Sequence, residues 1–182
     1  MSLGKPLLSV LVAGAALVAL VGAPAAAETA GYRDPADASA SLTDIRHVTV
    51  RHGGDGIAVV VRFTDLRRRS TGGPAGLSVF FDTVGRRRGP EFQLGTGLQA
   101  GTDYQLVRSR HRRGVGDPID CDYSVRLRYD ADRMVLHADR DCLGTPDRVR
   151  VGVLMTDEWD GSHPVEDWLG EPRSWTAWLT AG

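Results

Sequence analysis

The chain has 182 residues, with 22 Lys and Arg, 23 Asp and Glu, and 42% apolar side chains. This length suits one domain, and a net charge of −1 lacks the basic excess of proteins built to bind nucleic acid. The apolar content is too high for a wholly disordered chain. We therefore expect one folded domain and no nucleic-acid partner.

The first 27 residues have the pattern of a secretory signal peptide. Lys5 precedes an apolar run over 7–21, Pro24 would break a helix, and 25–27 are small residues that suit signal peptidase. An uncleaved anchor is the alternative, but the run is shorter than the ~20 residues that span a bilayer. We expect cleavage near Ala27, secretion to the extracellular space, and no stable membrane insertion afterwards. Removing 27 of the 182 residues takes away one cation and no acid, which leaves 155 residues with a charge of −2.

The remaining chain alternates between short apolar-polar runs and turn signals. Residues 28–42 are small and polar, which predicts a flexible N-terminal segment or a loose first edge. No 11-residue stretch after them has a helical period. Strands are predicted at 45–51, 57–63, 77–82, 92–95, 104–109, 123–129, 134–139, 149–156 and 174–179. Such spacing predicts an all-β, two-sheet antiparallel sandwich over 43–182, of jelly-roll or immunoglobulin-like type.

The two cysteines, Cys121 and Cys142, flank a predicted hairpin. A centre between 131 and 132 would oppose Leu127 to Leu136 and the two cysteines to each other, with the apolar pairs on the same side. A metal pair or a redox pair is the alternative, but there is no CxxC and no His at metal-ligand spacing. We predict one disulfide, Cys121–Cys142, which would stabilise the fold by roughly 3 kcal/mol.

Sequence motifs of catalysis are missing. The chain has no GxSxG, HExxH, GxxxxGK[ST] or GxGxxG, and its five histidines are scattered. Acidic residues gather at strand ends and turns, where carboxylates could collect extracellular calcium. The best group for calcium is Asp157, Glu158 and Asp160, and no other cofactor is indicated. The alternative is that Asp is common in turns because it bonds its own backbone.

Arginines form three clusters at predicted connections. The clusters are Arg67, Arg68 and Arg69; Arg86, Arg87 and Arg88; and Arg110, Arg112 and Arg113. In an up-and-down succession the second and third clusters share one end of the sandwich and the first lies at the other. The shared end could bind an anionic cell-wall polymer. The alternative is that these residues are solvated loop tips that guard strand edges.

All four tryptophans lie in the last 24 residues. Their rings could close the core or could form stacking platforms for a sugar. Trp175 and Trp178 would face opposite sides of the predicted strand 174–179, so only one of them could lie in the core. The candidate ligand-binding rings are Trp159, Trp168 and Trp178, with the Arg86 and Arg110 clusters beside them.

Four short motifs stand out in the chain. They are the opening at 44–50, Phe81-Asp82-Thr83 followed by Gly89-Pro90, Thr102-Asp103-Tyr104, and Cys142-Leu143-Gly144. Together they resemble motifs of small exported proteins of high-GC Gram-positive bacteria. The resemblance implies a β-sandwich and no established activity. The opening and the Phe-Asp-Thr strand end also resemble carbohydrate-binding sandwiches, from which no binding residue carries over.

The leading hypothesis for function is a secreted, non-catalytic module that binds a glycan or a cell-surface polymer. One alternative is a secreted hydrolase that uses loop carboxylates or histidine. The other is an envelope domain whose partner is a protein. An exposed tryptophan platform would favour the first, convergent carboxylates in a cleft the second, and a flat apolar face the third.

Overall fold

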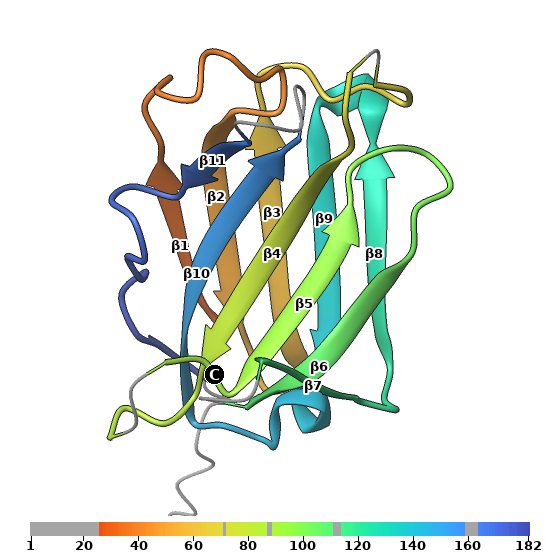
Figure 1. Cartoon of the computed structure of the whole chain (residues 1–182). Coiled ribbons are helices and arrows are strands. Elements are labelled where there is room, and N and C mark those ends of the chain that lie inside the picture. Colours follow the sequence, from red (N-terminus) through yellow and green to blue (C-terminus); the bar gives the residue numbers. More distant parts are fainter. Residues whose placement is uncertain (1–25, 71, 87–88, 111–113, 159–163) are drawn as a thin grey trace, which may run out of the picture.

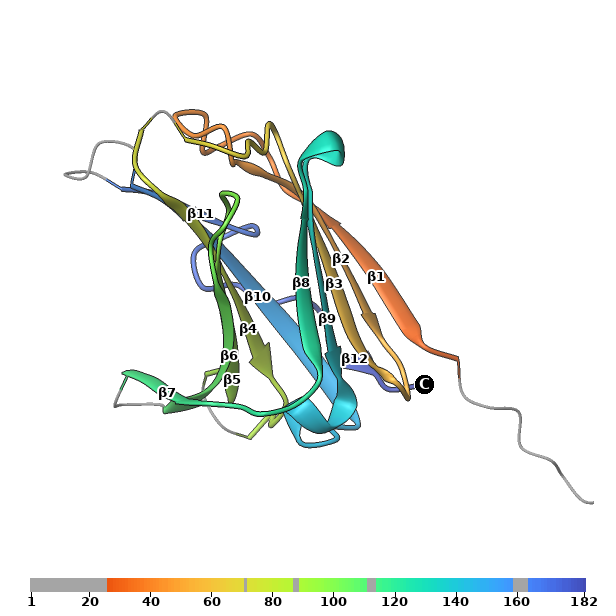
Figure 2. The same cartoon turned by 90° about the vertical axis from the view of Figure 1, so that its right-hand side faces the viewer.

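Two antiparallel sheets pack face to face in the protein (Figure 1), and the edge-on view in Figure 2 shows them as two layers. The computed structural model describes residues 26–182 except 71, 87–88, 111–113 and 159–163. One disulfide joins Cys121 to Cys142, with Cα atoms 5.5 Å apart. The predicted all-β, two-sheet antiparallel fold with one disulfide is therefore confirmed.

The first layer is a five-stranded sheet. Its order is β1 (Glu28–Arg33), β2 (Ile45–His52), β3 (Gly56–Phe63), β9 (Arg133–Asp139) and β8 (Tyr123–Arg128). The predicted strand 57–63 is apolar on both faces, and it lies at the centre of this sheet as β3. Its outward residues Ala58 and Val60 are half-buried, and Arg62 is exposed.

The second layer is a seven-stranded sheet. Its order is β11 (Val165–Trp168), β10 (Arg148–Asp157), β4 (Ala75–Asp82), β5 (Phe92–Gly97), β6 (Tyr104–Arg110) and β7 (Gly114–Pro118), with β12 (Leu179–Thr180) also beside β10. Alternate residues of β4 and β10 are buried between the layers, among them Val79, Phe81, Val151 and Val153. The residues between them therefore face away from the core.

Eight of the nine predicted strands are present, with ends that differ by a few residues at most. The ninth, 174–179, was wrong, because only Leu179–Thr180 pairs as a strand. Residues 28–42, predicted as a flexible segment or a loose edge, begin with edge strand β1, which pairs with β2 along its full length. Backbone pairing holds this polar segment in place, so the sandwich begins at 28 rather than at 43.

The predicted hairpin is present, but its register was wrong by two residues. Leu127 faces Met134 and Val125 faces Leu136. The turn is formed by the 3-10 helix η1 (Tyr129–Ala131) and by Asp132, whose backbone is left-handed (φ 46°). The centre of the hairpin therefore lies closer to β8 than predicted. A shift of two preserves the side of every residue. A second 3-10 helix, η2 (Arg140–Leu143), brings Cys142 to Cys121.

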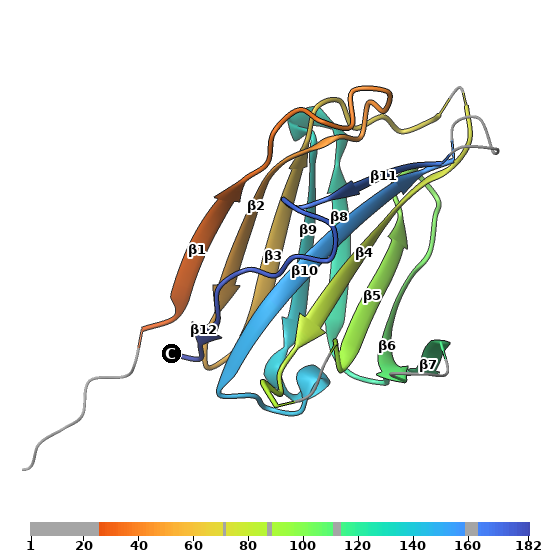
Figure 3. The same cartoon turned by 60° about the vertical axis from the view of Figure 1, so that its left-hand side comes forward.

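The segment after β11 returns along the edge of β10 to β12 (Figure 3). Leu169 N–H donates to Val153 O at 3.0 Å, and Thr176 N–H donates to Val151 O at 2.9 Å. These bonds join β11 and β12 into one irregular cover for the β10 edge. Within the described part of the chain, no helix is long and apolar enough to cross a membrane.

Candidate functional site

An aromatic pocket of about 520 Å³ opens on the outer face of the seven-stranded sheet. Its walls are Phe80, Gly89, Pro90, Gly152, Trp168, Arg173 and Trp175. The volume lies in the range of small-molecule pockets, and a mostly apolar wall with a few polar groups is their usual composition. We call this feature the aromatic pocket.

The residues that form the floor of the aromatic pocket share one face of the sheet because side chains alternate along a strand. Phe80 of β4 pairs with Gly152 of β10, and Leu154 of β10 pairs with Trp168 of β11, so all four residues share the outward face. The Phe80 and Trp168 rings are nearly parallel, with centroids 5.7 Å apart and planes 15° apart. The two rings support each other and fix one aromatic surface.

Trp175 occupies space that a missing side chain leaves free. A Cβ at Gly152 would lie 3.5 Å from the Trp175 ring and 3.3 Å from Ser174 O. The glycine therefore lets this ring lie over β10, so the segment that covers the β10 edge also supplies a wall of the pocket.

Arg173 reaches the pocket from a strained turn. Ser174 N–H donates to Glu171 O at 2.9 Å, with Pro172 and Arg173 between them. Arg173 has φ 64°, the left-handed region that a turn with proline at its second position normally gives to glycine. An arginine at such a position costs about 1 kcal/mol of stability. Its exposed side chain lines the pocket.

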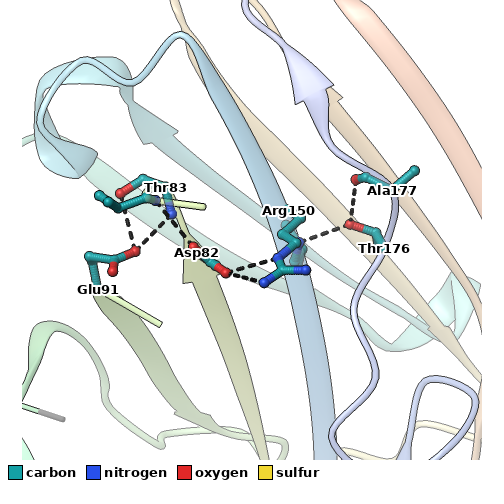
Figure 4. A network of polar contacts seen from close by, with 8 residues as sticks. Asp82, Thr83, Glu91, Arg150, Thr176 and Ala177 are labelled. Atoms are coloured by element: carbon teal, nitrogen blue, oxygen red, sulfur yellow. Dashed lines mark hydrogen bonds and ion pairs between the residues drawn. The ribbon is translucent and has the colours of Figure 1, made fainter. Parts of the chain in front are cut away.

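A partly buried ion pair joins Asp82 to Arg150 next to the pocket (Figure 4). Asp82, at the end of β4, is wholly buried, and its Oδ2 accepts hydrogen bonds from Arg150 Nε at 2.8 Å and Nη2 at 2.6 Å. The same guanidinium lies 5.2 Å from the Trp175 ring centre and 4.8 Å from that of Trp178. Asp82 therefore fixes Arg150, and Arg150 fixes both rings by cation–π contact.

The connection from β4 to β5 is tied down next to this pair. Thr83 N–H donates to Glu91 Oε2 at 2.8 Å, as Figure 4 shows. This connection supplies Gly89 and Pro90 to the aromatic pocket and also carries Arg86, whose side chain is exposed. A fixed pocket wall and a positive charge thus come from one segment.

The predicted tryptophans have separate positions. Trp168 lines the pocket, while Trp178 lies beneath Arg148 and Arg150, and Trp159 lies outside the described residues. Sequence reasoning placed Trp175 and Trp178 on opposite sides of a strand. That prediction was wrong, because the segment is irregular and both rings contact one guanidinium. Alternation along a strand therefore could not identify Trp175 as a pocket residue.

The connections that contain the arginine clusters lie at the two ends of the sandwich. β4 ends and β5 begins at the end of the sandwich where β6 ends and β7 begins, and the chain passes from β3 to β4 at the other end (Figure 1). Of the predicted binding arginines, Arg86 is exposed on its connection, and Arg110 ends β6. The remaining predicted arginines, Arg87, Arg88, Arg112 and Arg113, lie outside the described residues.

In the first cluster, Arg67 and Arg68 have partners in the structure. Arg67 Nη2 lies 2.6 Å from Asp65 Oδ2, and Arg68 lies over the Tyr129 ring. Local contacts therefore hold Arg67 and Arg68 at this end of the sandwich.

The residues predicted to bind calcium, Asp157, Glu158 and Asp160, do not form a described carboxylate cluster. Asp157 Oδ2 accepts the Ser41 hydroxyl at 2.6 Å, and Asp157 lines a cavity of about 320 Å³ together with Arg67 and Arg69. Asp65, which pairs with Arg67, also lines this cavity, so its two acids face two arginines. Glu158 is exposed, and Asp160 lies outside the described residues. Within the described ranges, the carboxylates that could share a metal are elsewhere, at Asp34, Asp37 and Asp167.

The chain matches no protein-family model and no curated protein. The interpretation of the aromatic pocket therefore depends on its own geometry.

Proposed function

We propose that the protein is an exported, non-catalytic module that binds a saccharide, with a preference for one that carries acidic groups. The observation that carries this proposal is the aromatic pocket, in which Trp168, Phe80 and Trp175 present fixed ring surfaces. The apolar C–H face of a sugar ring packs on such a surface, while its hydroxyl groups take hydrogen bonds from polar groups at the rim.

The rim chemistry supports an acidic saccharide. Arg173 lines the pocket, and Arg86 is exposed on the connection that supplies Gly89 and Pro90. A guanidinium binds a carboxylate or a phosphate through two parallel hydrogen bonds, whereas a neutral sugar offers only hydroxyl groups. Export is supported by the disulfide, which persists in oxidising compartments.

A hydrolase is less well supported by the same residues. Carboxylates do converge at Asp34 and Asp167, but these side chains are only 5% and 2% exposed. An acid that acts on a glycosidic bond must reach its substrate, so these two groups are in the wrong place for that role.

The test is binding of the purified protein to an array of neutral and acidic glycans and cell-wall polymers, followed by calorimetry on the best ligand. We expect Trp168→Ala and Trp175→Ala each to weaken binding about fivefold or more, since loss of one aromatic contact costs about 1 kcal/mol or more. Tyr104→Ala is the matched control, because Tyr104 is an exposed aromatic residue outside the pocket. Silence across the array, or full affinity in both tryptophan variants, would refute the proposal.

A further inference from the structure

Three carboxylates from distant parts of the chain meet at one edge of the sandwich. Asp34 follows β1, Asp37 lies in the connection to β2, and Asp167 belongs to β11. One oxygen of each lies within 4.8 Å of those of the other two. Oxygen ligands of a calcium ion lie about 2.4 Å from it, so two ligands of one ion are at most about 4.8 Å apart. The three groups are close enough to share one cation.

Asp34 and Asp167 are buried, and in each carboxylate one oxygen accepts a hydrogen bond while the other accepts none from the described residues. Asp34 Oδ1 accepts the Gly170 N–H and Asp167 Oδ2 accepts the Ile45 N–H, both at 2.6 Å. Among the described residues, Asp34 Oδ2 and Asp167 Oδ1 are buried with no hydrogen-bond partner. A buried carboxylate oxygen without a donor is costly unless a cation or a proton compensates it.

The neighbouring charges do not supply that compensation. Asp44 lies close enough to interact with both carboxylates, and its own Oδ2 already accepts from Thr64 and Arg46. The cation that acts on Asp34 is Arg46, and its guanidinium pairs with Asp44 Oδ2 at 3.2 Å, so its charge is shared with a fourth acid.

We propose that Asp34, Asp37 and Asp167 bind one calcium ion, which joins the segment between β1 and β2 to strand β11. An all-oxygen donor set selects a hard cation such as calcium over zinc or copper, which prefer nitrogen and sulfur. Asp37 is exposed and gives the ion a path from solvent, where water would complete the coordination. Bound calcium also fixes Trp168, because Trp168 follows Asp167 directly in β11. The cation site does not depend on saccharide binding.

The test is calorimetric titration of the purified protein with calcium, together with thermal unfolding in calcium and in EDTA. We expect one site per chain and a higher Tm in calcium. Asp37→Asn should weaken calcium binding at least tenfold, and its exposed position leaves the fold intact. Asp167→Asn should abolish binding without lowering Tm in EDTA, since the amide oxygen still accepts from Ile45 and one repelling charge is gone.

The matched control is Glu158→Gln, which removes an exposed acid from the place where the sequence predicted calcium. It should bind calcium as the unchanged protein does. The proposal is overturned if millimolar calcium gives neither heat nor a Tm shift, or if Asp37→Asn and Asp167→Asn keep full affinity. Tighter binding of magnesium than of calcium, or loss of binding in Glu158→Gln, would also overturn it.

Discussion

Asp34 and Asp167 connect the two sheets in opposite directions. Asp34, from the five-stranded sheet, accepts the N–H of Gly170 after β11, and Asp167, from the seven-stranded sheet, accepts the N–H of Ile45 in β2. Hydrogen bonds to a charged acceptor are stronger than those between neutral groups. At this edge the layers are therefore held by polar contacts between specific backbone groups, in addition to the apolar core.

The pH dependence of stability should reveal this pair when no divalent cation is present. Burial raises the pKa of Asp34 to about 6 and that of Asp167 to about 7, with further repulsion from Asp37 and Asp44, while Arg46 opposes the shift at Asp34. A carboxyl whose pKa is higher in the folded state binds more protons when folded. Its stabilising contribution is complete below the unfolded value near 4 and is lost as pH rises through 6 and 7.

We therefore expect the free energy of unfolding in EDTA to fall from pH 4.5 to pH 7.5 because of these two groups, as measured by urea denaturation. Asp167→Asn should flatten the pH profile, and Glu158→Gln should leave it unchanged. The assignment fails if the profile of Asp167→Asn matches that of the unchanged protein.

Substitutions at Arg173, in the strained turn, should affect stability and saccharide binding differently. Arg173→Gly should keep the free energy of unfolding or raise it by about 1 kcal/mol, because glycine adopts positive φ without a Cβ clash. The same change should weaken saccharide binding, because the guanidinium is lost from the pocket. Arg173→Ala is the control for the backbone, since it removes the side chain and keeps the strain. Equal affinity in all three proteins would show that Arg173 does not contact the ligand.

The partly buried pair of Asp82 and Arg150 should dominate the polar contribution to stability. Asp82→Asn leaves Arg150, whose side chain is 28% exposed, without its partner. We expect a loss of about 2–3 kcal/mol in urea denaturation, at or below the ~3–5 kcal/mol for a fully buried pair, because Arg150 keeps some contact with solvent. Tryptophan fluorescence should change as well, because Arg150 contacts Trp175 and Trp178. Asp65→Asn removes the partner of exposed Arg67 and should have no measurable effect on stability.

The contribution of the disulfide to stability should follow the logarithm of the length of the loop that it closes. Cys121 and Cys142 are 21 residues apart, so replacing both by alanine should lower the free energy of unfolding by roughly 3 kcal/mol. Denatured protein that has not been reduced should release no free thiol. Detection of two thiols per chain would contradict the structure at this point.

Much of the fold could be predicted because alternation and turn residues act locally. The apolar period of 57–63 and of 149–156 predicts two buried strands, and both are present as β3 and β10. Strand β11 was missed because Val165–Trp168 is too short to show a period. Strand β7, with Gly114, Gly116 and Pro118, contains residues that are rare in strands.

The aromatic pocket and the carboxylate cluster were harder to predict because each brings together residues that are far apart in the sequence. Asp34 and Asp37 are close in the sequence, but Asp167 lies 130 residues after Asp37 and reaches them only through the packing of β11. The pocket has the same origin, since Trp175 depends on the empty space over Gly152. The sequence could identify Trp168 as a candidate binding residue, but only the fold shows that it lies beside Phe80.

The irregular segment between β11 and β12, which lies along the edge of β10, affects whether that edge can pair with another chain. β10 is the longest strand, and four of its residues, including Val151 and Val153, are fully buried apolar side chains. If residues after β11 detach, the backbone groups of an apolar strand become free to pair with another chain, which is the usual start of ordered aggregation. The bonds of Leu169, Thr176 and Leu179 to β10 thus keep this strand edge paired within its own chain.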